Sequence, residues 1–325
     1  MIFFHFTQKR LNRNNISSII LTATILVLIG INAYLLFGYV SCHTAITNNT
    51  TPLIDPARRF YAADDLIINV QPLRDYFSDK YESDQNVSIY FEYLPTGANI
   101  SINKDAEFYP ASLLKLPIAM AVAKTIERGD YKWSNTITLQ ESDKNNDFGD
   151  LWQQPVGKVF TVEELVRELL INSDNTAQLM LLRNLDQIDQ NELFKVHEYL
   201  GLLDFFTEDG KISAKKYSPI LRSLYSASYL TVENSGKILQ LMSESNFNNF
   251  LTAGLPKNVK LAHKIGVNDE ENVYLDAGIV YPTSRPFILI VMVKNYDLIK
   301  TQEIIKDISQ KAYNYIADYP QSAIK

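Results

Sequence analysis

The order of strand-like and helix-like segments is the feature of this chain that most constrains its fold. Val87 to Tyr93 alternate apolar with polar side chains, which predicts a half-buried strand, and a turn at residues 95–97 leads to a partner strand around Ile100 and Ile102. Helical periodicity dominates the middle of the chain, from Ser112 to about Ser245. Three consecutive strands are predicted after it, at residues 260–267, 272–281 and 286–295. Strands at both ends around a helical centre imply one antiparallel sheet built from both ends of the domain.

Helices are predicted to flank this sheet. Arg58 to Tyr81 mixes apolar and charged residues as a surface helix does, and Ile299 to Tyr319 closes the domain as an amphipathic helix. The predicted fold class is therefore α/β (α+β), in which an antiparallel sheet flanked by helices lies beside an all-helical lobe. A cleft is expected between the two.

The N-terminal part of the chain contains an almost uninterrupted apolar run of 25 residues, Ile16 to Val40. About 20 apolar residues cross a bilayer core as a helix. Lys9, Arg10 and Arg13 precede the run, and no acidic residue occurs before Asp55. This bias places the N-terminus in the cytoplasm, so we expect a single-pass protein of the cell membrane with an extracytoplasmic domain.

Four segments follow from this interpretation: a cytoplasmic basic segment at 1–15, a transmembrane anchor at 16–40, a linker at 41–56 and one globular domain at 57–325. A buried core helix is the first alternative for the apolar run, but the length of the run and its basic flank argue against it. A cleaved signal peptide is the closer alternative, although no clean small-x-small site follows. Lipidation of Cys42 is disfavoured by the bulky Tyr39 three residues before it.

Composition argues against several classes of function. The net charge of −6, without a basic patch, disfavours nucleic acid as a partner. One cysteine allows no disulfide within the chain, and with four histidines it forms no metal-ligand pattern. The sequence also lacks a glycine-rich phosphate loop, so we expect neither a metal nor a cofactor.

The stretch Ser112-Leu113-Leu114-Lys115 is the first indication of chemistry. The Ser112 hydroxyl and the Lys115 amine are three residues apart at the start of an apolar helix, so they share one helix face. A serine hydroxyl is a weak nucleophile until a neighbouring base takes its proton. A buried lysine with a depressed pKa can be that base. Taken alone, the pair is better explained by a helix-capping serine and a surface lysine.

Two further motifs change this balance. Ser173-Asp174-Asn175 follows a helix predicted from Thr161, which forms a capping box with Glu164, and a second helical run comes after it. A turn between these helices would direct a hydroxyl and an amide into the cleft. His263-Lys264-Ile265-Gly266 lies on the first of the C-terminal strands. Their ordinary explanations are turn chemistry and an edge-strand lysine beside a glycine that permits a bulge.

Together and in this order, the three motifs resemble the signature of the penicillin-recognising serine acyl-transferases, especially class A β-lactamases: Ser-x-x-Lys, Ser-Asp-Asn and Lys-Thr-Gly. The resemblance covers residues 86–317. It implies that Ser112 attacks a carbonyl and forms an acyl-enzyme, with Lys115 as base or proton relay. Ser173 would pass a proton to the leaving nitrogen. Lys264 would attract the substrate carboxylate and help to keep Lys115 neutral.

The resemblance also implies a set of substrate-binding groups. Asn175 would hydrogen-bond the side-chain amide of the substrate, and Gly266 and Val267 would border it on the strand. The backbone N–H groups of Ser112 and Val267 would form the oxyanion hole, since the first N–H groups of a helix are unpaired donors at the positive end of its dipole.

Two departures from the family pattern bear on the reaction. Ile265 stands where the family has Thr or Ser, so we expect one hydrogen bond to the substrate carboxylate to be lost. No Glu-x-x-Leu-Asn stretch occurs between Ser173 and Lys264; Glu208 or Asp209 could substitute, although Glu-Asp-Gly favours a turn. Without a base that activates water, acylation is expected and deacylation should be slow.

The expected function is that of a membrane-anchored serine hydrolase of the class A β-lactamase-like family. Its substrate would be a β-lactam or the acyl-D-Ala-D-Ala stem peptide of peptidoglycan, as for β-lactamases and D,D-peptidases. The alternative is a catalytically weak or inactive family member that binds peptidoglycan or a partner. The matching polar side chains favour the enzyme, and the natural substrate and oligomeric state are left open.

Overall fold

The computed structural model describes residues 22–34, 53–55, 66–67, 69–203 and 210–319. The chain divides into two compact units, Met1–Thr50 and Thr51–Lys325. In the first unit, residues 22–34 form a helix. Across the described residues, none of the helices combines the length and the apolar character that a bilayer crossing requires. The rest of the predicted anchor, the basic segment 1–15 and most of the predicted linker lie outside the described residues.

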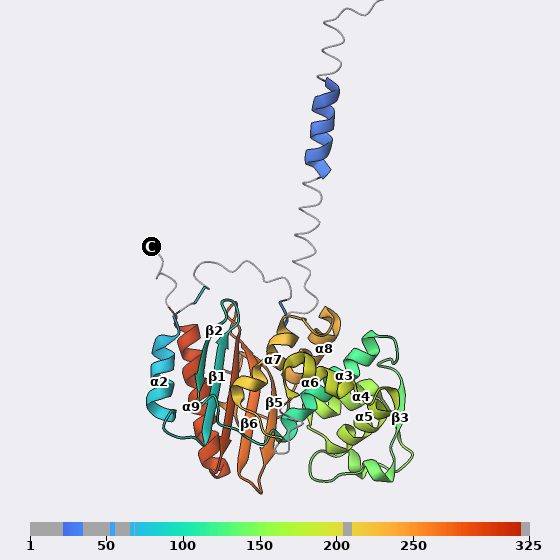
Figure 1. The fold of residues 1–325 in the computed structure, drawn as a ribbon, viewed down its shortest axis with the longest axis vertical. Helices are drawn as coiled ribbons and strands as arrows, with labels where there is room; N and C mark the ends of the chain where they lie inside the picture. The colour runs from blue at the N-terminus through green and yellow to red at the C-terminus, as the bar shows by residue number, and fades with distance from the viewer. Residues whose placement is uncertain (1–21, 35–52, 56–65, 68, 204–209, 320–325) are drawn as a thin grey trace, which may run out of the picture. The chain divides into compact units, whose positions relative to one another are not determined.

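The second unit contains a five-stranded antiparallel sheet (Figure 1). Its strands are β1 Val87–Tyr93, β2 Ala98–Ile102, β5 Lys260–Asn268, β6 Val273–Tyr281 and β7 Phe287–Lys294. Their order is β2-β1-β7-β6-β5, so the N-terminal hairpin pairs directly with the last strand. The prediction of one sheet built from both ends of the domain is confirmed, and β5 forms one edge of that sheet.

Strand β1 is buried along its whole length, so the prediction of a half-buried strand was wrong. The polar residues on one face of β1 pack against helix α7, Ala214–Tyr225, rather than against water. The Arg222 guanidinium donates to Glu92 Oε1 at 3.0 Å, and the Tyr90 hydroxyl donates to Glu92 Oε2 at 2.7 Å. A buried charge is tolerated when it is paired. The alternation of apolar and polar side chains in β1 therefore reflects two covered faces of the strand, not one face exposed to water.

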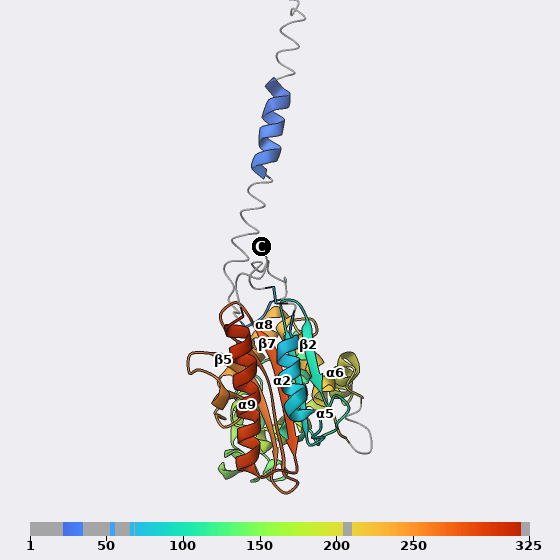
Figure 2. The ribbon, with the colours of Figure 1, turned by 90° about the vertical axis from the view of Figure 1, so that its left-hand side faces the viewer.

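Two helices cover the other face of the sheet. Helices α2, Gln71–Tyr81, and α9, Leu298–Ala317, lie next to each other in Figure 2, and the Tyr81 hydroxyl donates to Asp307 of α9 at 2.7 Å. The helix predicted from Arg58 begins only at Gln71. Described residues 66–67 and 69–70 are not helical, and residues 58–65 and 68 are outside the described part of the chain.

The chain between β2 and β5 forms the predicted helical lobe (Figure 1). Its other helices are α3 Lys115–Glu127, α4 Val162–Ile171, α5 Asn175–Ile188, α6 Glu192–Leu200 and α8 Val232–Ser243. The predicted capping box of α4 is present, because Thr161 and Glu164 each accept a hydrogen bond from the other's backbone N–H. A short sheet of β3, Thr136–Thr138, and β4, Val159–Thr161, escaped prediction because three-residue strands carry too little pattern.

The core between the sheet and the helical lobe includes residues from the predicted linker. Leu53 and Ile54 are buried in this core, and the Tyr281 hydroxyl donates to the Leu53 carbonyl at 2.8 Å. The packed part of the chain therefore begins before residue 57.

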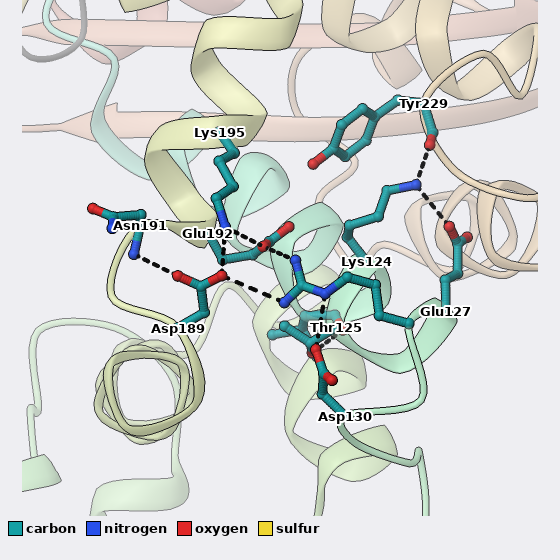
Figure 3. A network of polar contacts seen from close by, with 11 residues as sticks. Lys124, Thr125, Glu127, Asp130, Asp189, Asn191, Glu192, Lys195 and Tyr229 are labelled. Atoms are coloured by element: carbon teal, nitrogen blue, oxygen red, sulfur yellow. Dashed lines mark hydrogen bonds and ion pairs between the residues drawn. The ribbon is translucent and has the colours of Figure 1, made fainter.

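A polar network fixes the end of α3 that is remote from Ser112 (Figure 3). Glu192 at the start of α6 is only 1% exposed, and its carboxylate pairs with Arg128, which follows α3. The Lys124 amine donates to Glu127 at 2.8 Å and to the Tyr229 carbonyl. Because the Glu192 carboxylate is buried and needs its charged partner, this network holds the end of α3 against α6 and the segment before α8.

Candidate active site

Ser112 lies in a short 3₁₀ helix, Ala111–Leu114, that leads into α3. Ala111, the residue before it, has a φ of 44°, in the left-handed region that non-glycine residues rarely adopt. Ser112 is half-buried and lines a pocket of about 580 Å³ between the sheet and the helical lobe. The predicted nucleophile is therefore accessible to a small substrate.

Ser173 and Asn175 lie at the junction between α4 and α5. Ser173 has a φ of 55°, and Asp174 caps α5 by accepting the Ala177 N–H at 2.7 Å. The other Asp174 oxygen accepts the Leu151 N–H at 2.9 Å, which ties the loop before Leu151 to this junction. The turn expected between the two helices is present and directs Ser173 and Asn175 toward Lys115.

One serine hydroxyl joins the two predicted catalytic lysines. The Ser173 Oγ accepts a hydrogen bond from the Lys115 amine at 3.1 Å and another from the Lys264 amine at 2.8 Å. The Lys115 amine also donates to the Ser173 carbonyl, and to Asn175 Oδ1 at 2.6 Å. The structure thus brings together four predicted residues from α3, the α4–α5 junction and β5.

The hydrogen bonds of Lys115 differ from the prediction in one respect. Its amine donates to Ser173 and Asn175, and the expected contact with the Ser112 hydroxyl is not among the hydrogen bonds of the described residues. Catalytic hydrogen bonds are often long or misaligned before substrate binds. Without substrate, the Lys115 amine is held by Ser173 and Asn175, the two residues on either side of Asp174.

The two lysines sit in an environment that disfavours positive charge. Both side chains are 1% exposed. Burial lowers the pKa of Lys115 to about 8, against the opposing effect of Asp174. Burial and then the charge of Lys115 lower the pKa of Lys264 well below its usual value, while Asp276 acts in the opposite direction. A minor fraction of Lys115 is therefore neutral and able to accept a proton near neutral pH, and this fraction grows as the pH approaches 8.

Gly266 permits a close approach rather than a bulge. Its φ is not in the positive region, and the pairing of β5 with β6 runs without interruption from Lys260 to Asn268. A Cβ atom at this position would lie 2.9 Å from the Pro110 carbonyl oxygen and 3.3 Å from Leu113 Cγ. Glycine therefore lets the edge strand reach the Ser112 segment, and the bulge explanation was wrong.

Val267 borders the pocket at the free edge of β5. The Ile265 carbonyl accepts a hydrogen bond from the Lys264 amine at 3.2 Å, so it points away from β6. In antiparallel pairing the N–H and C=O of a residue point the same way and the direction repeats every second residue. The Val267 N–H therefore points to the same side, as an oxyanion-hole donor requires.

The Ile265 side chain faces away from the pocket, and the expected loss of a substrate hydrogen bond at this position stays a prediction. Its side chain is 3% exposed and belongs to an apolar cluster with Phe250 and Tyr274. Because β-strand side chains alternate, Lys264 faces the helical lobe while Ile265 faces the α9 side. A threonine hydroxyl here would enter apolar core.

Several pocket residues were missed by the sequence analysis. Asn145, Asp147 and Phe148 come from the loop between β3 and β4, and the Asn175 amide donates to Asn145 Oδ1 at 3.0 Å. The other missed residues are Tyr109, Leu114, Gln178, Leu179 and Asn268 to Glu270. The Asn, Asp and Gly content of residues 145–150 predicts a loop, but no local signal shows where it folds. Glu208 and Asp209, the suggested water activators, lie outside the described residues.

Comparison with known proteins agrees with this geometry. A model described as the β-lactamase enzyme family matches residues 71–316. The chain belongs to this family. VEB-1, a β-lactamase of Pseudomonas aeruginosa, is 24% identical over 252 residues, which cover 66% of this chain and 80% of VEB-1. The resemblance inferred from the three motifs is therefore confirmed, and the chain is a β-lactamase-like serine hydrolase.

Solved structures share the fold of this β-lactamase family member. PBP-A has a TM-score of 0.68 at 24% identity, over 77% of this chain and 97% of PBP-A. A β-lactamase from Sphaerobacter thermophilus has a TM-score of 0.69 at 20% identity, over 78% of this chain and the whole of that structure. Among the described residues, no group of three or more His, Cys, Asp or Glu side chains could hold a metal ion.

The depressed pKa of Lys115 predicts how stability depends on pH. In the unfolded chain the amine stays protonated up to its ordinary pKa of 10.5, whereas in the fold it loses its proton near pH 8. The unfolded state therefore binds more protons between these values, and this lysine's cost to stability shrinks as pH rises.

We expect the difference in unfolding free energy between Lys115→Met and the wild type to change by about 2 kcal/mol between pH 7 and 9.5, in favour of the wild type at the higher pH. Urea unfolding at both pH values measures this difference. Comparing the variant with the wild type cancels the contribution that the tyrosines make to the pH dependence of unfolding. Lys216→Met is the control, since its side chain is 49% exposed. A pH-independent difference would contradict the buried, neutral amine.

Proposed function

We propose that this protein forms an acyl-enzyme on Ser112 with β-lactams or with acyl-D-Ala-D-Ala peptides. The observation that carries the proposal is the Ser173 hydroxyl held between the Lys115 and Lys264 amines, beside a pocket lined by Ser112. A nucleophile, a low-pKa amine and a hydroxyl relay are the groups that amide cleavage by a serine requires. The family membership of the chain supports the same chemistry.

In the proposed acylation, the neutral Lys115 amine takes the proton of Ser112 Oγ as that oxygen bonds to the substrate carbonyl carbon. The carbon–nitrogen bond then breaks, and the proton passes from Lys115 through Ser173 Oγ to the leaving nitrogen. The 3.1 Å hydrogen bond between the Lys115 amine and Ser173 Oγ provides the path. On this path the transferred proton comes no closer to a protonated Lys264 than the Ser173 hydroxyl, which lies between Lys264 and Lys115.

Backbone N–H groups would stabilise the negative charge on the carbonyl oxygen. Ser112 occupies the first turn of its helix, where N–H groups lack helical partners, and the Val267 N–H points to the free edge of β5. Such a donor typically contributes roughly 2.7–4 kcal/mol to lowering the barrier. The close approach that Gly266 allows between β5 and the segment before α3 would bring these two donors toward one oxygen.

Slow release of the acyl group is the second part of the proposal. The acidic side chains that line the described pocket are Asp147, Asp269 and Glu270, and all three are exposed. Asp147 also accepts a hydrogen bond from the Asn145 amide at 3.1 Å. A solvated carboxylate is a poor base for water, so these groups favour the behaviour of a D,D-peptidase or penicillin-binding protein. A mutant of PBP-A, a structural relative, forms an acyl-enzyme complex with penicillin G.

The first prediction concerns the nucleophile. Intact protein incubated with penicillin G should gain the mass of one penicillin, and Ser112→Ala should abolish this gain because Ser112 is the only serine or threonine among the described residues that line the pocket. Ser101→Ala, on β2, is the control and should label as the wild type does. Mass spectrometry of intact protein reads out both. Equal labelling of Ser112→Ala would refute the assignment, and a folded wild type that never labels would favour the peptidoglycan-binding alternative.

The second prediction concerns turnover. Acyl-enzyme hydrolysis without a general base loses roughly 10²–10⁴-fold in rate, so a chromogenic cephalosporin should give a burst of one equivalent followed by slow release. Stopped-flow absorbance separates the two phases. Rapid steady turnover without a burst would show that another group activates water, and the β-lactamase assignment would then replace the D,D-peptidase one.

We further propose that residues 16–40 anchor the protein in the cell membrane, with the catalytic domain outside. The apolar run and the basic residues before it support this topology. Protease added to intact cells should remove the chain after residue 42 and leave an N-terminal epitope tag protected. A domain that survives active protease until the cells are lysed would contradict this orientation.

A further inference from the structure

Two phenylalanine rings lie over the two lysine amines. The Lys115 Nζ is 6.0 Å from the centre of the Phe148 ring, and the Lys264 Nζ is 5.8 Å from the centre of the Phe247 ring. The two rings contact each other, with centres 5.8 Å apart and planes tilted by 42°. They form a continuous apolar cover, which we call the aromatic roof, over the Lys115–Ser173–Lys264 group.

Separate anchors hold the two halves of the roof. The Phe148 carbonyl accepts the Asn175 N–H at 2.9 Å, and a Cβ on the next residue, Gly149, would lie 2.1 Å from Asp174 Oδ2. The loop that carries Phe148 is thus pressed against the Ser173–Asn175 junction, and only a glycine after it allows this contact.

The segment that carries Phe247 is attached on both sides. The Asn246 N–H donates to the Ile171 carbonyl at 3.4 Å, at the end of α4. On the other side, the Leu251 N–H donates to the buried carboxylate of Asp276 at 3.0 Å, and that carboxylate also bonds His263 on β5. Phe247 is therefore placed by the same two elements, α4 and the β5–β6 pair, that supply Ser173 and Lys264.

We propose that Phe148 and Phe247 are positioning residues that keep water from the Lys115 and Lys264 amines, and that each ring so favours the neutral form of the amine that it covers. The proposal rests on the proposed function of Lys115 as the acylation base. Phe148 also lines the pocket, whereas Phe247 packs against Lys264 and Phe148 behind it. Phe247 therefore gives the cleaner test, because its replacement leaves the described pocket lining intact.

The roof affects the pKa of the lysine amines in two opposing ways, and the two effects differ in size. A ring face attracts a cation and raises the pKa of an amine, typically by about one to one and a half units when desolvated. Exclusion of water lowers the pKa by up to about 3–5 units in a fully buried site. The charged groups that act on the lysines are Asp174 on Lys115, and Lys115 and Asp276 on Lys264; replacing Phe247 changes none of them. Opening the roof at Phe247 should therefore raise the pKa of Lys264, the amine beneath that ring, while the added charge on Lys264 acts against a rise at Lys115.

The test compares Phe247→Ala, which opens the roof, with Phe247→Leu, which keeps an apolar cover without a ring. In protein carrying ¹³C-labelled lysine, the titration midpoint of the Lys264 side chain is followed by NMR and assigned with Lys264→Met. We expect Phe247→Ala to raise this midpoint by about one pH unit relative to Phe247→Leu. Phe194→Ala, which removes a 42% exposed ring on α6, is the control and should not move it.

Equal midpoints in the alanine and leucine variants, or a lower midpoint in alanine, would overturn the proposal, because a merely structural ring would weaken folding without moving the amine's titration. Circular dichroism and thermal unfolding confirm that each variant is folded, and Phe247→Gln replaces the alanine variant if that one does not fold. The NMR result does not depend on acylation. A wild type that fails to react with penicillin would therefore refute the proposed function while the titration still decides the role of the roof.

Where the wild type is acylated, the rate gives a second measurement. In Phe148→Ala, which opens the roof over Lys115, the acid limb of the acylation pH profile should move to higher pH, with the plateau rate at high pH largely retained. Phe148→Leu should keep the wild-type profile. A uniform drop in rate with an unmoved profile would show that the ring only supports the fold.

Discussion

The Ser173 hydroxyl is held between two buried lysine amines, and most of the second unit is arranged to make this contact possible. Two ammonium groups on one oxygen repel each other, and burial adds to the cost of their charge. The arrangement is tolerated because burial favours the neutral amine and because negative charge acts on each lysine, from Asp174 on Lys115 and from Asp276 on Lys264. The lysines come from α3 and β5, one in each lobe, so the contact forms only when the sheet and the helical lobe pack in one register.

Local strain is concentrated at the same place. Ala111 and Ser173 have positive φ values, each costing about 1–3 kcal/mol for a residue with a side chain. Gly149 and Gly266 lie where a Cβ atom would collide with Asp174 and with the Pro110 carbonyl. The surrounding structure offsets this strain: Asp174 caps α5 and also fixes the neighbouring loop, and the network around Glu192 holds the far end of α3. The energy stored at the site is thus supported by contacts that have no part in the chemistry.

The sequence predicted the elements whose signal is local or periodic, and missed those whose position depends on distant partners. The central helices, the C-terminal strands and the capping box of α4 follow from spacing alone. The burial of β1 could not be read from its alternation, because Arg222, more than a hundred residues later, is what covers Glu92. The burial of Ile265 likewise depends on distant partners, because the strand's alternation turns its side chain toward the α9 side of the sheet. The loop with Phe148 and the segment with Phe247 carry no motif, and only the fold brings them to the lysines.

The site also separates two demands that a hydrolase must meet in sequence. In the proposed mechanism acylation needs a dry amine, and the buried lysines beneath Phe148 and Phe247 offer one. Deacylation needs an ordered water beside the ester, held by a group that can take the proton of that water. A buried amine cannot hold such a water, because the water would remove the dry environment that keeps the amine neutral. The water-activating group must therefore come from a different element than the lysine pair. In this chain the pocket's described carboxylates are exposed and lie on loops, so the fold can retain the first half of the reaction while the second half varies independently. A change from a long-lived to a short-lived acyl-enzyme would require one buried carboxylate at the pocket, and no rearrangement of Ser112, Lys115, Ser173 or Lys264.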